Sequence, residues 1–279
     1  MATAVRQQGQ LSIDGARLEC CWLGPGPDEA LTLVLLHEGL GCVAMWKEFP
    51  ARLAEATGCG VLVYSRLGHG GSDPAPLPRP LDYMEREAVQ VLPKVLDTCD
   101  IRRAILVGHS DGASIATIYS GSVEDHRVRG LVLIAPHFLV EERTLAGIRA
   151  ARDAFEQGEL RRRLERHHGA NVDGAFWGWN RVWLDPTFRH WSIEDCLAYI
   201  RVPILIIQGT DDPYGTQRQI EAAREETYCP VDLCLLQCGH APHAEQPDAT
   251  LAAVTAFVRR LVEVHGEDPR RAAPVGMRT

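Results

Sequence analysis

The sequence lacks a long apolar run and any basic stretch concentrated enough to suggest nucleic-acid binding. No segment approaches the roughly 18 consecutive apolar residues that a membrane-spanning helix needs. The first ten residues, MATAVRQQGQ, have no apolar core, so no secretory signal peptide is expected there. The formal net charge is −8, which argues against nucleic acid as a partner. We therefore expect a cytoplasmic protein that acts on a small molecule, with neither nucleic acid nor a membrane as a partner; a homodimer is left open.

The nine cysteines are an odd number and are scattered along the chain. Several, such as Cys59 and Cys99, lie in or beside apolar runs, which is typical of buried free thiols in a cytoplasmic protein. Cys234 and Cys238 are close together, but no second cysteine pair and no suitably spaced histidine accompanies them, as a zinc site would require. We expect neither a metal nor a cofactor.

Short apolar runs alternate with segments of helical character along most of the 279 residues. Residues 11–23 are expected to form two strands joined by a tight turn at Asp14-Gly15. Further strands are predicted at 31–36, 61–64, 104–107, 131–134, 203–207 and 231–236, and helices at about 46–57, 81–99, 113–119 and 249–264. This alternation predicts an α/β fold with a mostly parallel sheet of about eight strands and helices on both faces.

The alternation stops between Pro136 and Tyr199, where the sequence has helical character but no strand pattern. We interpret residues 137–199 as a helical cap inserted after the sixth strand, which divides the core into 1–136 and 200–265 and leaves a polar tail at 266–279. Trp177 and Trp183 are expected to line a substrate pocket under this cap; the alternative is that the tryptophans only pack the cap against the core. The arginine run at 161–163 is interpreted as a solvated helix face.

The segment Gly108-His109-Ser110-Asp111-Gly112 lies between a predicted strand and a predicted helix. A serine on such a sharp turn adopts a strained backbone conformation, and its neighbours two residues away on each side must be small. The strain lifts the hydroxyl clear of the sheet. Ser110 is therefore the candidate nucleophile.

A serine hydroxyl needs a base to take its proton, and the base needs a third group to orient it. Two further predicted strands end in suitable residues, Asp211-Asp212 after one and His240 after the next. Open α/β sheets place their sites just past the carboxyl ends of parallel strands. The order serine, acid, histidine along the chain is the order known for this architecture.

Taken together, these residues resemble the α/β-hydrolase fold family from about Leu11 to Val264. The family's Gly-x-x-Asp after the penultimate strand matches Gly209 to Asp212, which implies that Asp212 orients the histidine, with Asp211 as the alternative. Its Gly-His followed by an acid and a proline matches Gly239-His240 with Glu245 and Pro247, which favours His240 over His243 as the base.

The resemblance also implies an oxyanion hole, which needs two N–H donors aimed at developing negative charge. One is expected from Asp111, and the other from Gly39 in His37-Glu38-Gly39, with Leu40 as the alternative. Glu38 and Leu40 are expected to border the substrate pocket. The carboxylates of Glu38 and Asp111 have two interpretations: Asp111 complements the helix dipole and Glu38 points outward, or both repel anionic acyl groups.

The resemblance implies a serine hydrolase that cleaves a small or medium carboxylic ester or thioester through an acyl-enzyme. Because fold does not determine chemistry, two alternatives remain. The same triad could serve carbon-carbon bond hydrolysis, lyase chemistry or cofactor-free perhydrolysis. The fold could also serve as a non-catalytic binding protein for a small ligand.

Overall fold

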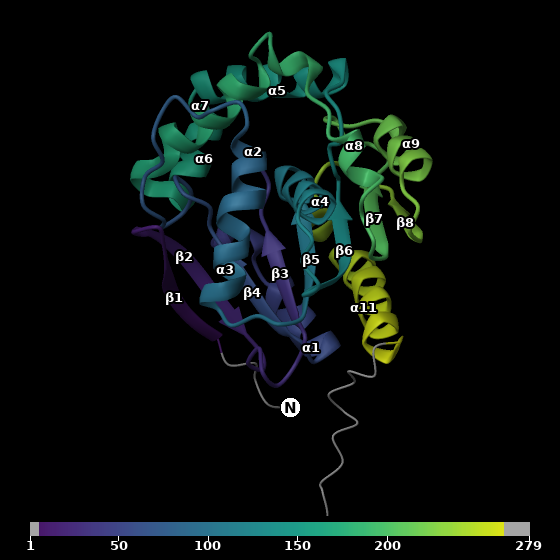
Figure 1. Cartoon of the computed structure of the whole chain (residues 1–279). Helices are drawn as coiled ribbons and strands as arrows, with labels where there is room; N and C mark the ends of the chain where they lie inside the picture. The colour runs from purple at the N-terminus through teal and green to yellow at the C-terminus, as the bar shows by residue number, and fades with distance from the viewer. Residues whose placement is uncertain (1–5, 265–279) are drawn as a thin grey trace, which may run out of the picture.

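The computed structural model describes residues 6–264 and contains one eight-stranded sheet (Figure 1). The strands lie in the order β1-β2-β4-β3-β5-β6-β7-β8. β1 and β2 are antiparallel to their neighbours, and the strands from β4 to β8 are parallel. Their bounds are β1 Arg6–Ile13, β2 Ala16–Leu23, β3 Thr32–Leu36, β4 Gly60–Tyr64, β5 Ala104–His109, β6 Val128–Ile134, β7 Ile204–Gly209 and β8 Val231–Leu236. The predicted fold class is confirmed.

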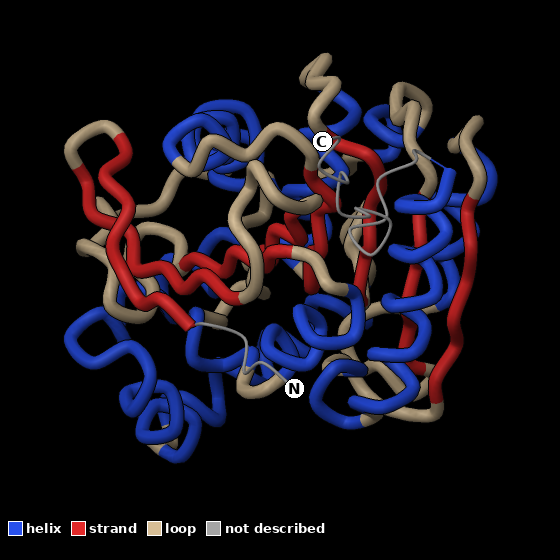
Figure 2. Tube along the Cα trace, turned by 90° about the horizontal axis from the view of Figure 1, so that it is seen from below, coloured by secondary structure: helices blue, strands red, loops and turns tan. Residues whose placement is uncertain are grey.

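The central strands are apolar and fully buried because helices cover both faces of the sheet, as Figure 2 shows from below. Alternate residues of β5 belong to different cores: Leu106 packs with the side of α2, α3 and α4, and Val107 with the side of α1 and α11. These helices are α1 Phe49–Thr57, α2 Tyr83–Arg86, α3 Leu92–Thr98, α4 Asp111–Ser122 and α11 Pro247–Val264.

The predicted turn and helices are present, with shifted boundaries. Asp14 and Gly15 join β1 to β2 with φ angles of 51° and 81°, the left-handed conformation that a two-residue hairpin turn needs. The helix expected over 81–99 is interrupted by a π-helical turn, η2 (Glu87–Val91), between α2 and α3. The 3-10 turn η1 (Val43–Trp46) precedes α1, and the short α10 (Pro242–Glu245) precedes α11. Helix α9 (Gln217–Glu226) was not predicted.

The segment between β6 and β7 contains helices and no strand of the sheet. Its elements are α5 Glu142–Glu156, α6 Glu159–His168, η3 Gly169–Asn171, α7 Val172–Trp183, η4 Phe188–His190 and α8 Glu194–Leu197. Figure 1 shows α5, α6 and α7 above the ends of the strands, whereas α8 lies beside α9. The division of the chain at 136/137 and 199/200 stays a prediction, and the proposed tail at 266–279 lies outside the described residues.

Hydrogen bonds attach this insertion to the loops that follow β3 and β4. The buried His168 ring accepts from Gly70 N–H through Nδ1 at 2.9 Å and contacts the Leu40 carbonyl through Nε2 at 2.8 Å. The Asn171 amide donates to the carbonyls of Gly70 and Ser72. The C-terminal end of α6 is therefore held directly over the loop that carries Gly39 and Leu40.

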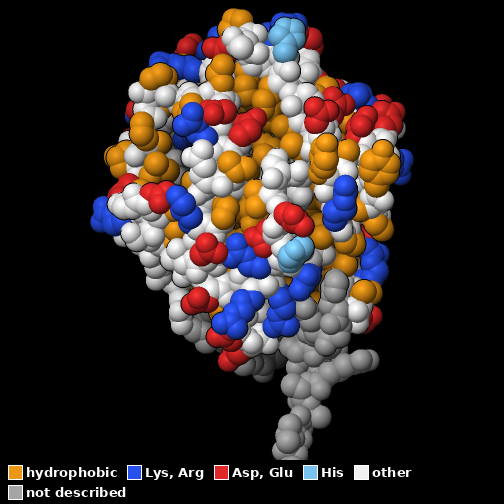
Figure 3. All heavy atoms as spheres, viewed as in Figure 1, with side chains coloured by type: hydrophobic (Ala, Val, Ile, Leu, Met, Phe, Trp, Pro, Cys, Tyr) orange, Lys and Arg blue, Asp and Glu red, His pale blue; other side chains and the backbone are white. Residues whose placement is uncertain are grey.

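No disulfide joins cysteines within residues 6–264. In the same part of the chain, no three His, Cys, Asp or Glu side chains are grouped so as to hold a metal ion. None of the described helices is long and apolar enough to cross a membrane. On the face shown in Figure 3, acidic and basic side chains are interspersed.

Candidate active site

Ser110 lies between the end of β5 and the start of α4, with φ 53° and ψ −117°. This conformation is strained for a residue with a side chain. It also requires the two flanking glycines, because a Cβ on Gly108 would lie 2.3 Å from the Gly112 carbonyl oxygen. A Cβ on Gly112 would lie 2.0 Å from the Leu36 carbonyl oxygen of β3. The local geometry is therefore that of a nucleophile elbow.

Asp212 and His240 are hydrogen-bonded at the ends of β7 and β8. His240 Nδ1 lies 2.8 Å from Asp212 Oδ2 and 2.9 Å from Oδ1. The buried carboxylate also accepts from Gln208 Nε2 and from the Tyr214 N–H, each at 2.8 Å. Burial opposes the charge on Asp212, but the bonds from His240, Tyr214 and Gln208 outweigh it and hold its pKa below the usual value. Asp212 is therefore an ionised acceptor that orients the imidazole.

The backbone on both sides of His240 is fixed by other side chains. His109 Nε2 donates to the His240 carbonyl at 2.8 Å. The Glu245 carboxylate accepts from the N–H groups of Gly239 at 2.8 Å and Ala241 at 3.0 Å. The acid that follows the Gly-His motif thus holds the loop that presents the imidazole.

The structure separates the two alternative residues from this pair. Asp211 is exposed, and His243 is buried against Trp46, with ring centroids 4.8 Å apart. Burial and the nearby His240 and Lys47 lower the pKa of His243 to about 4. The geometry therefore selects Asp212 and His240.

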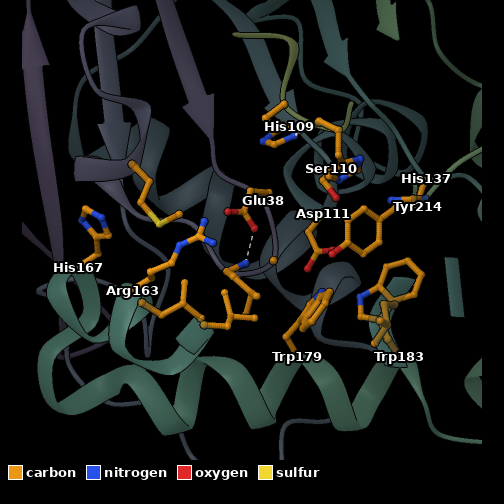
Figure 4. Close-up of a pocket in the computed structure, with 18 of the residues that line it drawn as sticks. Glu38, His109, Ser110, Asp111, His137, Arg163, His167, Trp179, Trp183 and Tyr214 are labelled. Carbon is orange, nitrogen blue, oxygen red and sulfur yellow. Dashed lines mark hydrogen bonds between the residues drawn. The ribbon is translucent and has the colours of Figure 1, made fainter. Parts of the chain in front are cut away.

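Ser110 and His240 line the same pocket, which has a volume of about 400 Å³ (Figure 4). Ser110 Oγ forms no hydrogen bond to a side chain among residues 6–264, and this includes the His240 ring. Catalytic hydrogen bonds are often long in a free enzyme and tighten when substrate binds. The serine hydroxyl is thus open to a ligand in this pocket.

Gly39 lines the pocket, and its N–H direction is fixed by contacts to the same peptide's carbonyl. The carbonyl of the preceding residue, Glu38, is held on the opposite side by His37 Nδ1 at 2.7 Å, Arg66 Nη2 at 3.0 Å and Gly41 N–H at 3.0 Å. Because C=O and N–H point in opposite directions in a trans peptide, these three donors fix the direction of the Gly39 N–H. No acceptor for this N–H is present among the residues that the structure describes.

Leu40, the alternative donor, has its N–H occupied. It donates to Glu38 Oε2 at 2.5 Å, and the carbonyl of the same peptide, that of Gly39, contacts His69 Nε2 at 3.1 Å. The second N–H that is open belongs to Asp111, which is the first residue of α4 and so has no intrahelical acceptor. The geometry favours the pair predicted from the sequence, Gly39 and Asp111.

Glu38 and Asp111 differ in how their carboxylates are partnered. Asp111 is buried, accepts from Tyr83 Oη and lies 4.0 Å from Arg66 Nη2. Glu38 lines the pocket beside Ser110, so the expectation that it points outward is wrong. Burial raises the pKa of both carboxyls, and each remains close enough to Arg66 for that cation to oppose the rise.

The helical insertion supplies much of the pocket lining. Trp183 lines the pocket as predicted, but Trp177 does not: it packs against Phe155 and Phe176. Trp179 takes the place expected for Trp177, and its indole lies so close to Gly39 that a Cβ there would come within 2.3 Å of it. On a helix, residues two apart face different sides, so the correct tryptophan depends on how α7 is rotated.

Several pocket residues were not predicted as site residues. Helix α6 contributes Arg163, Arg166 and His167, and the strand ends contribute His137 and Tyr214. Arg163 borders the pocket but is itself exposed, as is Arg162, so the arginine run is solvated and one of its members also lines the pocket. The spacing of Arg163, three residues from Leu160, a leucine that also lines the pocket, was the only available signal.

The sheet order and the strained serine at the end of β5 define an α/β hydrolase. The chain matches the model of the alpha/beta hydrolase family over residues 33–254, and it belongs to that family. It is 23% identical to a proline iminopeptidase from Lactobacillus acidophilus over 221 residues, 66% of this chain and 75% of the relative. Identity to the proline iminopeptidase of Lactobacillus helveticus is 23% over 263 residues, 79% of this chain and 87% of that protein.

Solved structures of the same fold include enzymes with different names. A putative aryl esterase from Burkholderia cenocepacia has a TM-score of 0.71 at 20% identity, covering 92% of this chain and 100% of its own. The proline iminopeptidase of Mycobacterium smegmatis has a TM-score of 0.70 at 19% identity, covering 93% of this chain and 100% of its own. These similarities establish the fold and leave the substrate to the site.

Proposed function

We propose that the protein is a serine hydrolase of small or medium carboxylic esters or thioesters, acting through an acyl-enzyme. The observation that carries the proposal is the Asp212–His240 pair in one pocket with the strained Ser110 and two unoccupied N–H groups. Each component of acyl transfer has a counterpart there: nucleophile, base, orienting acid and oxyanion donors.

The proposed reaction has two stages. Ser110 Oγ attacks the carbonyl carbon while His240 Nε2 takes the hydroxyl proton, and the N–H groups of Gly39 and Asp111 bind the oxyanion. Collapse of the intermediate breaks the bond to the alcohol or thiol, which leaves with the proton from His240. Water, deprotonated by His240, then attacks the acyl-enzyme and releases the acid and the serine.

A fluorophosphonate probe tests the nucleophile. We expect one covalent label on the native protein, located on Ser110 by peptide mass spectrometry, and none on Ser110→Ala. A panel of aryl esters and thioesters should be hydrolysed by the native protein only. Labelling without turnover of any panel member would instead favour the alternative reactions on the same triad, or a binding protein.

Hydrolysis of an amide next to a free amine is the second candidate. The relatives named as proline iminopeptidases suggest it, and the Glu38 carboxyl on the pocket wall is a group that could bind an ammonium. Turnover of prolyl-p-nitroanilide, together with its loss in Glu38→Gln, would favour this candidate. Turnover of neutral aryl esters alone would favour the first.

A further inference from the structure

Helix α6 presents a mixed apolar and cationic face to the pocket. Leu160, Arg163, Leu164 and His167 are three or four residues apart, so they lie on one side of the helix, and Arg166 adjoins them. Figure 4 shows Arg163 and His167 at one end of the pocket, on the side of Glu38 away from the tryptophans. This end of the pocket therefore carries two permanent positive charges.

Arg163 and Arg166 differ from Arg161, two residues before Arg163, in their charged partners. Arg161 is paired with Asp173 at 2.7 Å and Glu165 at 3.4 Å. Arg163 and Arg166 form no ion pair within the described part of the chain. A second hollow, lined by Lys47, Arg163 and Glu38, adjoins the same end, so a third cation lies near it. Cations that are gathered on one wall and are not neutralised by ion pairs favour an anionic ligand.

The carboxylates of the pocket lie deeper and are already engaged. One oxygen of Glu38 binds the Leu40 N–H, and Asp111 is bonded to Tyr83 beside Arg66. They border Ser110, at the middle of the pocket in Figure 4. An anion bound by Arg163 and Arg166 would lie on the far side of Glu38 from Ser110, and so away from the scissile carbonyl.

The opposite end of the pocket is aromatic and uncharged. Trp179, Trp183, Tyr214 and His137 line it. Burial, with His240 nearby, lowers the pKa of His137, so its ring is neutral. Its Nδ1 is buried without a hydrogen-bond partner among the described residues. Flat rings and a free imidazole suit a neutral planar group that carries a polar atom.

We propose that the substrate has two unlike arms joined at the scissile ester or thioester. One arm carries a carboxylate or a phosphate that binds Arg163 and Arg166, and the other is a neutral planar group that lies among Trp179, Trp183 and Tyr214. This inference rests on the proposed function and adds the substrate class to it. Arg163 and Arg166 are specificity residues, since they do not contact the reacting atoms.

Matched esters test the proposal in both orientations. Benzoate esters of methoxyethanol, glycolate and 2-phosphoethanol place no charge, a carboxylate or a phosphate on the alcohol. For the acyl arm, phenyl valerate is the neutral ester, and monophenyl glutarate carries a carboxylate at the end of an acyl chain of the same length. In one of the two series, with the anion either on the alcohol arm or on the acyl arm, we expect kcat/KM to be higher for the anionic ester than for its neutral match. The difference should come mainly from a lower KM. The preferred alcohol-arm anion distinguishes carboxylate from phosphate.

Three variants separate this subsite from general charge effects. Arg163→Gln and Arg166→Gln should each lower kcat/KM for the preferred anionic ester roughly tenfold, as loss of a partly exposed charge-assisted bond does. Neutral esters should change less than twofold. Arg162→Gln, an exposed arginine of α6 outside the pocket lining, should leave both unchanged.

The outcomes distinguish this inference from the function on which it rests. Hydrolysis of the neutral esters without preference for an anion, or a preference that survives the double Arg163→Gln/Arg166→Gln variant, overturns the two-armed substrate and leaves the hydrolase standing. No hydrolysis of any ester, with no label on Ser110, overturns both. A preference lost in the two variants and retained in Arg162→Gln supports the proposal.

Discussion

Replacing Asp212 by Asn tests the proposed orientation of the catalytic imidazole. The carboxylate accepts three bonds, from His240 Nδ1, Gln208 Nε2 and the Tyr214 N–H. An asparagine has one oxygen and one NH2 group in the same places. If the oxygen faces Tyr214, the NH2 faces the Gln208 amide and His240. At least one of the three bonds is then replaced by two donors in contact.

The expected loss follows from what His240 must do in response. To avoid the new NH2 group, the neutral ring would move its proton to Nε2, and it could no longer take the serine proton. In serine hydrolases the equivalent change costs about 10⁴ in kcat, which corresponds to about 5.4 kcal/mol of transition-state stabilisation. Because Asp212 is buried and its pKa is lowered, bulk water does not substitute for it.

The assay is the steady-state hydrolysis of a neutral aryl ester, with the rate of fluorophosphonate labelling as an independent readout. Both rates should fall together in Asp212→Asn. Asp211→Asn is the matched control, because that carboxylate is adjacent but exposed, and it should stay within twofold of the native protein. A kcat for Asp212→Asn within tenfold of the native value, in a variant with native circular dichroism, would refute the orienting role.

Three further predictions concern the elbow, the buried His243 and the loop after β3. Gly112→Ala should lower the free energy of unfolding, measured by urea titration, by about 1–3 kcal/mol, because the added Cβ would lie 2.0 Å from the Leu36 carbonyl oxygen of β3. Gly26→Ala is the control, because a Cβ there would meet nothing within 4 Å. His243, whose pKa is lowered to about 4, stays neutral when folded, while the unfolded chain gains a proton below about pH 6.5. Its contribution to stability is thus present above pH 6.5 and lost on acidification, by about 1.4 kcal/mol at pH 5.5, so melting curves of His243→Gln should depend less on pH over that range. Glu38→Ala removes the acceptor of the Leu40 N–H and should lower kcat on a neutral ester about tenfold. Glu38→Gln keeps an acceptor oxygen and should not lower it. Equal kcat values in the two variants would contradict the proposal that the Glu38–Leu40 hydrogen bond holds the loop that carries the Gly39 N–H.

The order of strands and helices and the elbow were predictable because their signals are local. A strand covered on both faces reads as an apolar run wherever it occurs, and the glycines around Ser110 are required by contacts within a few residues of the serine or with the adjacent strand. Their position after a buried strand was sufficient to nominate the serine. The loop ends bearing Asp212 and His240 followed from the rule that parallel strands place their carboxyl ends at one edge.

The pocket wall was less predictable, because it depends on the rotation of helices that are far apart in the sequence. Trp177 and Trp179 have the same chemistry, and only the packing of Phe155 and Phe176 against Trp177 shows which indole reaches the pocket. The roles of Glu38 and Leu40 likewise depend on the contacts between the loops after β3 and β4.

Local pattern was therefore enough to predict the α/β hydrolase fold and to nominate the serine, and the acid and histidine at neighbouring strand ends, as candidate site residues. Long-range packing decided which N–H groups are open, which tryptophan lines the pocket, and that the exposed Arg163 of α6 borders that pocket. The physical reason is that apolar periodicity reports which face of an element is buried. It does not report which other element, distant along the chain, that face will meet.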